Sequence, residues 1–231
     1  MLDTEVAPTA NYKPPNRRPA HHDVIYWGYE DIGLFFLGLL LLGPLLRLTI
    51  RAHILTPGML LRPTVTLQTG VMVFLLALLY SILKLRYRRH VWAALGWTVP
   101  ACKCLLACLL SGGILALTVD VLAHTVSVPK SLIRLSDIAL LAGTLAPVLE
   151  ESLFRGFLLP VLARTMGSTV AVLATALVFT ALHQPATAVQ WVSFMVTGTA
   201  YGWIRVNSGS TAAAGLMHGT YNLTLILCQK L

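Results

Sequence analysis

Stretches of apolar residues recur along the chain from residue 32 to residue 227, and most are long enough to cross a bilayer. About 20 helical residues span the ~30 Å hydrocarbon core, and polar residues, Gly and Pro separate the stretches. We predict seven spanning helices, over residues 32–50, 65–85, 104–126, 138–162, 169–183, 189–206 and 211–227. An eighth, half-inserted segment over residues 91–99 is an open alternative, because His90, Trp92 and Trp97 are typical of the membrane interface.

The composition agrees with this pattern. Hydrophobic residues make up 56% of the chain and charged residues 11%, whereas soluble domains average about 25% charged residues. An ordinary soluble globular domain is therefore excluded, and we predict an all-α fold, a polytopic membrane bundle of seven to eight transmembrane helices. The 17 Lys and Arg outnumber the 9 Asp and Glu, but in a membrane protein such an excess first reflects topology, so no nucleic-acid partner is predicted.

The distribution of polar residues predicts how the chain is organised. Residues 1–30 are polar and rich in proline, so we expect a disordered N-terminal tail and no cleavable signal peptide. Residues 31–136 and 137–231 are expected to form the two halves of one membrane unit. More Lys and Arg fall on the loops that share a side with the N-terminus, above all at 84–89, which predicts a cytoplasmic N-terminus. The small size favours the plasma membrane of a prokaryote.

Three ionisable residues lie within six positions of the predicted helix at 138–162. A charged side chain at mid-helix in a bilayer costs about 2.5–3.5 kcal/mol, so Glu150, Glu151 and Arg155 need an explanation. Glu151 and Arg155 are four residues apart, which places acid and base on one helix face and predicts an ion pair. Glu150 is turned about 100° from Glu151 and has no base at i+3 or i+4. Its partner is therefore expected on another helix, unless all three form only a structural ion cluster.

Candidate partners for Glu150 occur in two later helices. His183 ends the 169–183 segment, four residues after Phe179, and His218 and Asn222 lie four residues apart within 211–227. A carboxylate beside an imidazole can activate water as a general base, and an imidazole or amide N–H can stabilise an oxyanion. Each histidine alone is as readily interpreted as a packing residue; their combination with an unpaired glutamate favours a site.

Other motifs indicate packing or are weak. Gly198 and Gly202 form a G-x-x-x-G motif, which we expect to pack two helices within the bundle rather than to form a dimer face. Ser81 and Lys84 form a Ser-x-x-Lys pair at the basic end of a predicted span, a weak candidate nucleophile. The H-E-x-x-H and G-x-S-x-G motifs do not occur. The four cysteines, at 102, 104, 108 and 228, are interpreted as small residues of membrane helices without disulfides.

The three motifs in order, Glu150-Glu151-x-x-x-Arg155, Phe179-x-x-x-His183 and His218-x-x-x-Asn222, resemble those of the CPBP family. That family joins the type II CAAX prenyl endopeptidases with the bacterial Abi proteins, which are linked to bacteriocin processing or immunity. The resemblance covers about residues 137–227, and the N-terminal half is similar to the family only as a set of generic spans.

The resemblance implies a role for each motif residue. Glu150 would be the catalytic glutamate and would act with His183 on a water molecule, while His218 and Asn222 would stabilise the oxyanion. Glu151 and Arg155 would support the site from the predicted helix at 138–162, which we call the motif helix, and Phe179 would support it as well. If a divalent metal such as zinc were bound, Glu150, His183 and His218 would be its ligands. Glu151 would then be the only evident base left, and it is already paired with Arg155. We therefore favour a mechanism without a metal cofactor.

The function predicted from these residues is an intramembrane endopeptidase, a hydrolase that cleaves a membrane-anchored or lipidated protein or peptide. Its partners would be membrane lipid and that substrate; a prenylated C-terminus as substrate is implied only by the resemblance. Two alternatives stay open. One is a proton-coupled transporter in which Glu150, His183 and His218 form a relay, and the other is a non-catalytic immunity-type membrane protein.

Overall fold

The computed structural model of this chain describes residues 25–51, 63–124 and 141–228, and all of its regular structure is helical. The prediction of an all-α fold is thereby confirmed for the described residues, and each of the seven predicted segments is helical there. The helices are α1 (Tyr29–Arg51), α2 (Pro63–Tyr87), α3 (Val91–Ala94), α4 (Cys102–His124), α6 (Ala146–Glu151), α7 (Leu159–Met166), α8 (Ser168–Leu182), α9 (Ala188–Ser208) and α10 (Thr211–Cys228). Two π-helical segments, η2 (Leu141–Leu145) and η3 (Ser152–Leu158), flank α6.

The segment at 91–99, where a half-inserted eighth segment was an open alternative, contains only the four-residue α3 and a turn. Gly96 in that turn has φ +81°, a conformation that side chains with a Cβ rarely adopt. The turn anchors the last helix, because the Thr211 N–H donates to the Gly96 carbonyl at 2.7 Å. This short segment therefore fixes where α10 begins.

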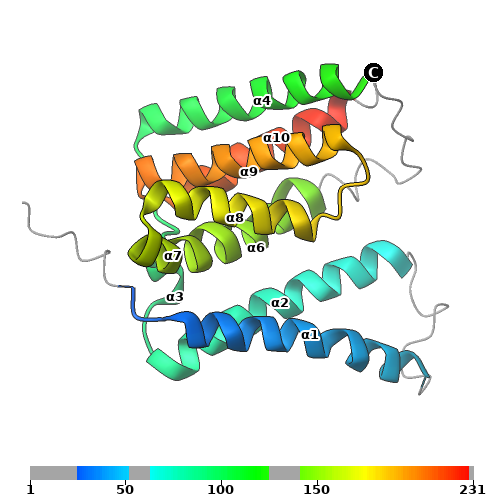
Figure 1. Cartoon of the computed structure of the whole chain (residues 1–231), viewed down its shortest axis with the longest axis vertical. Coiled ribbons are helices and arrows are strands. Elements are labelled where there is room, and N and C mark those ends of the chain that lie inside the picture. The colour runs from blue at the N-terminus through cyan, green and yellow to red at the C-terminus, as the bar shows by residue number, and fades with distance from the viewer. Residues whose placement is uncertain (1–24, 52–62, 125–140, 229–231) are drawn as a thin grey trace, which may run out of the picture.

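The long helices lie side by side in an antiparallel arrangement (Figure 1). The α1–α2 hairpin lies at one side of the bundle, α4 packs on α10 at the other, and α6, α8 and α9 lie between them. One apolar core joins α1, α2 and α3 to η3, and a second joins α4, α9 and α10. The helices that carry the predicted motifs thus occupy the middle of the molecule.

The predicted tail differs from the structure at its end. We expected disorder up to residue 30, but Trp27 is buried against the bundle, and its Nε1 donates to the Phe157 carbonyl at 2.9 Å. A buried indole whose N–H is satisfied is a stable anchor, which explains why the chain is fixed two residues before α1 begins. Residues 1–24 lie outside the described part of the chain.

Polar contacts hold together the end of the bundle where α1 begins and α2 ends. The buried Asp31 carboxylate pairs with Arg86 Nε at 3.0 Å and accepts a hydrogen bond from Tyr87 Oη at 2.7 Å. Arg164 at the end of α7 donates to the Ile25 carbonyl. Because Lys84 and Arg89 also lie here, we name this the basic end of the bundle.

The G-x-x-x-G motif packs α9 against α8, as predicted. A Cβ added at Gly198 would lie 3.2 Å from the Ala176 backbone, and one at Gly202 would lie 2.9 Å from Val172 Cγ1. Only glycine allows α8 and α9 to approach this closely. The motif is therefore a packing surface inside the bundle.

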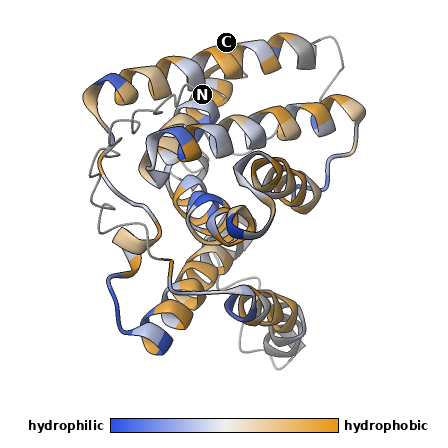
Figure 2. Ribbon diagram, turned by 60° about the vertical axis from the view of Figure 1, so that its left-hand side comes forward, coloured by the Kyte–Doolittle hydropathy of each residue, from blue (hydrophilic) through white to orange (hydrophobic). Residues whose placement is uncertain are grey.

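Two helices are long and apolar enough to cross a membrane by length and composition, over Thr69–Tyr87 and Cys102–Val121. Hydrophobic residues also predominate along the outer helices of the bundle (Figure 2). On α4 the exposed face carries Leu106, Leu110, Ile114, Leu117 and Val121, at the spacing of a single helix face. A contiguous exposed apolar surface of this kind marks contact with lipid or with another apolar surface.

Candidate active site

The central helical segment widens immediately after the two glutamates. Residues Ser152–Leu158 form the π-helix η3, and the Leu159 N–H donates to the Phe154 carbonyl five residues earlier. Pro160 follows at once; it has no N–H for the Gly156 carbonyl, and its ring would clash with that carbonyl in an α-helix. We attribute the wide turn to this proline. π-Helical turns are frequent at functional sites.

Glu151 and Arg155 form the predicted pair. Arg155 Nη1 lies 3.2 Å from Glu151 Oε1, and both side chains are fully buried. Arg155 Nη2 donates to the Gly198 carbonyl at 2.7 Å, which joins the motif helix to α9. Its guanidinium lies over three aromatic rings, with centroid distances of 5.6, 4.9 and 5.3 Å, those of Phe154, Phe179 and Tyr201. Cation–π contacts stabilise a desolvated cation, so Arg155 is fixed from several sides.

Glu151 has a second partner that the spacing argument did not predict. Its Oε1 also lies 2.8 Å from His218 Nδ1 on α10. A carboxylate acceptor here requires a hydrogen on Nδ1, so in a neutral imidazole Nε2 keeps its lone pair. Glu151 therefore orients His218 and selects its tautomer, in addition to pairing with Arg155.

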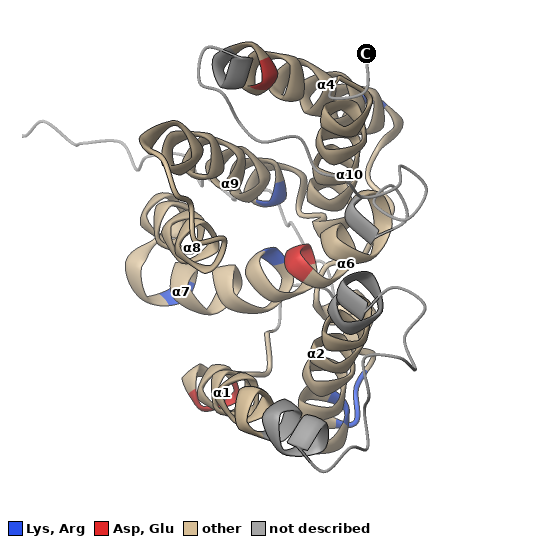
Figure 3. Cartoon of the chain, turned by 90° about the vertical axis from the view of Figure 1, so that its right-hand side faces the viewer, with Lys and Arg blue, Asp and Glu red and all other residues tan. Residues whose placement is uncertain are grey.

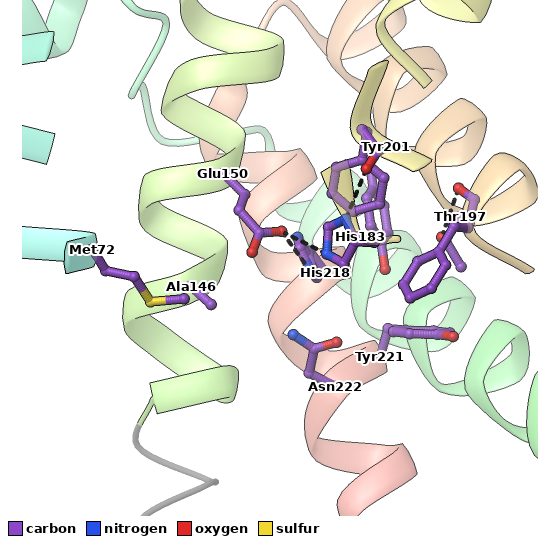
Figure 4. A pocket seen from close by; sticks show the side chains of 11 residues that line it. Met72, Ala146, Glu150, His183, Thr197, Tyr201, His218, Tyr221 and Asn222 are labelled. Carbon is purple, nitrogen blue, oxygen red and sulfur yellow. Dashed lines mark hydrogen bonds and ion pairs between the residues drawn. The ribbon is translucent and has the colours of Figure 1, made fainter. Parts of the chain in front are cut away.

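Glu150 meets both histidines, on two other helices, as its lack of a local partner predicted. Its Oε2 lies 3.8 Å from His183 Nε2 and 3.8 Å from His218 Nε2 (Figure 4). These separations are too long for direct hydrogen bonds, and the Oε2 atom is buried without one among the described residues. A water molecule about 2.8 Å from both atoms fits between Glu150 Oε2 and the Nε2 of either imidazole.

His183 is held so that Nε2 faces Glu150. It follows the last residue of α8, and its Nδ1 lies 2.8 Å from the Phe179 carbonyl. A carbonyl only accepts, so Nδ1 carries the hydrogen and the neutral ring presents a free lone pair at Nε2. The ring lies between Phe179 and Phe194, at centroid distances of 4.3 and 4.5 Å. The two aromatic rings thus fix the orientation of the His183 ring.

These residues surround a cavity of about 240 Å³. α2, α6, α8, α9 and α10 all contribute to its wall. Asn222 lines it one turn beyond His218 (Figure 4). Glu150 and His183 are partly exposed, with 18% and 29% of their side chains accessible. The lining residues are Met72, Ala146, Glu150, Phe179, His183, Phe194, Thr197, Tyr201, His218, Tyr221 and Asn222.

Tyr201 is a site residue that the sequence reasoning missed. Its ring stacks on His218, with centroids 4.6 Å apart and planes 18° from parallel, and its hydroxyl is buried without a hydrogen-bond partner among the described residues. The residue lies inside the Gly198–Gly202 motif, which we interpreted only as a packing surface. A polar aromatic residue between two closely packing glycines was the available signal.

The residues around Glu150 do not form a metal site in this arrangement. Within residues 25–51, 63–124 and 141–228, no three His, Cys, Asp or Glu side chains are grouped to hold an ion. In tetrahedral zinc with bonds of about 2.0–2.1 Å, ligand atoms lie roughly 3.3 Å apart, less than the 3.8 Å from Glu150 Oε2 to either imidazole. The donor set implied by the resemblance thus does not match the spacing of tetrahedral zinc ligands in this arrangement.

Residues 135–224 match the family model of type II CAAX prenyl endopeptidase Rce1-like proteins. The matched segment contains all three motifs, and the match confirms the family resemblance that they predicted. It begins just before the motif helix and leaves α1, α2 and α4 outside. Comparison with curated proteins and with solved structures finds no match.

Proposed function

We propose that this chain is an intramembrane endopeptidase that hydrolyses a peptide bond of a membrane-associated substrate. The observation that carries the proposal is the convergence of Glu150 Oε2, His183 Nε2 and His218 Nε2 in one cavity. One water molecule can donate hydrogen bonds to two of these atoms, and water is the reactant that hydrolysis needs. The similarity to a family of endopeptidases supports the same conclusion.

In the proposed reaction, Glu150 accepts a proton from the bound water while the water oxygen attacks the peptide carbonyl carbon. His183, whose Nε2 faces the same position, relays that proton to the leaving amide nitrogen. The C–N bond then breaks, and the new carboxyl and amino termini hold the two elements of water. Each step uses a group within reach of one site, so no further reactant is required.

The oxyanion that forms on the carbonyl needs a donor. Asn222 on the cavity wall can donate from its amide, and His218 can donate from Nε2 when both of its ring nitrogens carry hydrogen. The side chains of Glu150 and Glu151 lie on either side of the His218 ring and hold it in place. Glu151 and Arg155 are therefore assigned as positioning residues.

The helices are proposed to span a membrane, which the two candidate spans and the exposed apolar face of α4 support. A cytoplasmic N-terminus would place the basic end of the bundle in the cytoplasm. In this orientation His183, which follows the last residue of α8, lies toward the side opposite the cytoplasm. Under it, substrate would reach Glu150 from the outer side or laterally from lipid.

The proposed substrate is a membrane-anchored or lipidated peptide segment that enters the cavity in extended form. The backbone of a helix in lipid is satisfied internally, so a segment must unwind before its carbonyl can reach Glu150. The matched family's description names prenyl endopeptidases. A prenylated C-terminal segment is accordingly the first substrate to test, beside an unprenylated transmembrane segment.

The test is cleavage of such fluorogenic substrates by the purified protein in lipid vesicles, with Glu150→Gln as the main variant. We expect its cleavage rate to fall by about 10²–10⁴-fold, the usual contribution of a general base, because the amide cannot accept the proton. His183→Gln should lose activity by a similar factor. Glu30→Gln is the matched control, since Glu30 is an exposed carboxylate at the basic end.

Wild-type cleavage by Glu150→Gln, with its melting temperature unchanged, would overturn the proposal. Loss of substrate-independent proton uptake in the same variant would favour the transporter hypothesis instead. Inhibition of the wild type by a chelator, reversed by zinc, would refute the metal-independent mechanism alone.

A further inference from the structure

A second cavity, of about 340 Å³, lies at the basic end of the bundle and takes no part in the proposed hydrolysis. Three arginines from three different segments line it, Arg155, Arg164 and Arg205, together with Ser168 at the start of α8. None of the described residues that line it is acidic. Figure 3 shows how few charged residues the central helices carry, which makes three cations around one cavity unusual there.

The residues that line the cavity become more exposed from its inner wall to its mouth. Arg155 at its inner wall is fully buried, Arg205 is half-buried, and Arg164 and Ser168 are exposed at its mouth. Arg155 Nε is buried without a hydrogen-bond partner among the described residues, although both of its Nη atoms have partners. A buried guanidinium N–H that lacks an acceptor favours binding of an oxygen anion there.

The start of α8 adds backbone donors to the same cavity. Gly167 precedes the helix with φ +79° and provides no side-chain cap. The first backbone bond runs from the Ala171 N–H to the Gly167 carbonyl at 3.0 Å, so the N–H groups of residues 168–170 have no acceptor within the helix. A helix N-terminus beside arginines is a common way to bind phosphate.

We propose that this cavity, which we name the anion cavity, binds a phosphate group. Arginine is suited to this role because its planar donors match phosphate oxygens in pairs. Two sources share this chemistry, free phosphate and the headgroup of an anionic lipid. At the end of a membrane bundle the headgroup is the nearer source, and the proposed cytoplasmic orientation would expose it to the more anionic leaflet.

The experiment measures the melting temperature of the purified full-length protein in detergent. One arm titrates inorganic phosphate against chloride at constant ionic strength, and the other adds phosphatidylglycerol against phosphatidylcholine. Two variants change residues that line the anion cavity and leave Arg155 unchanged. Arg164→Gln deletes a donor at the mouth, and Ser168→Asp puts a fixed carboxylate at the helix start, where it is favourable to the helix itself.

Lys103→Gln is the matched control, because it removes one exposed positive charge from the same end outside the anion cavity. We expect the wild type and Lys103→Gln to be stabilised by the anion, and both cavity variants to lose at least four-fifths of that temperature shift. Stabilisation by the lipid alone would identify a headgroup site, and stabilisation by both would identify phosphate as sufficient. Absence of any shift in the wild type, or its survival in either cavity variant, overturns the proposal. Neither result depends on peptidase activity.

Discussion

The two cavities on either side of the Glu151–Arg155 pair differ in charge and share their framework. The cavity at Glu150 joins carboxylate to imidazole, whereas the anion cavity is lined by arginines. Ser168 at the start of α8 lines the anion cavity and His183 just after its end lines the other, while α9 contributes Arg205 and Tyr201 to the same two cavities. The difference shows that one pair of packed helices can support opposite electrostatics at its two ends, provided that a neutralised buried ion pair separates them.

The largest expected effect comes from removing that separating pair. Arg155→Met would leave Glu151 as an uncompensated buried charge, and breaking a buried pair in this way costs about 3–5 kcal/mol of unfolding free energy. We expect a sharply lower melting temperature and yield of folded protein. The double variant Glu151→Gln with Arg155→Met should recover part of the stability, because neither charge remains. If the single variant melts like the wild type, the two cavities do not depend on this pair.

Asn222→Ala should affect only the cavity at Glu150. Loss of one oxyanion donor lowers the turnover number by about 10²–10³-fold, while the response to phosphate or anionic lipid stays at its wild-type value. Cleavage kinetics and melting curves on the same preparation check the loss of turnover and the unchanged anion response. Arg164→Gln is the reciprocal variant, and a similar loss of cleavage in both would show that the cavities are not separable.

Gly202→Ala should have the smallest effect but should reach both cavities. The new Cβ would lie 2.9 Å from Val172 Cγ1, and overpacking of this kind costs about 1–3 kcal/mol. Because α8 and α9 would separate slightly, both the cleavage rate and the anion response are expected to fall by a modest factor. Gly209→Ala is not an adequate control, since φ there is +68°; Gly33→Ala, whose added Cβ meets nothing within 4 Å, is.

The helical fold could be predicted because apolar runs and their Gly and Pro breaks are local signals. The polar residues that mark the site also weaken the membrane signal, because His218 and Asn222 lower the hydropathy of α10. α8 is apolar but short, so only two of the described helices are both long and apolar enough to cross a membrane. The pairing of Glu151 with Arg155 followed from spacing alone. The contact of Glu151 with His218 did not, because it joins residues 67 positions apart.

The burial of Trp27 in the predicted tail and the contact of Tyr201 with the site were not predicted, for a related reason. Trp27 is buried only because Phe157, 130 residues later, presents a carbonyl to it, and Tyr201 reaches His218 only because α9 and α10 pack together. Composition describes a residue's own preference and not the surface it meets. Burial of single aromatic residues in polar or glycine-rich contexts therefore needs the tertiary structure.

α8 also sets a distance between the two cavities. Ser168 and His183 are 15 residues apart, which along a helix is about 22 Å, most of the ~30 Å thickness of a bilayer core. If the helix spans the membrane as proposed, the two cavities face different leaflets. The lipid composition of one monolayer would then be sampled by the same short helix that presents a base to a substrate near the other, and the contacts of Arg155 with Glu151 and of Glu151 with His218 run between those two depths.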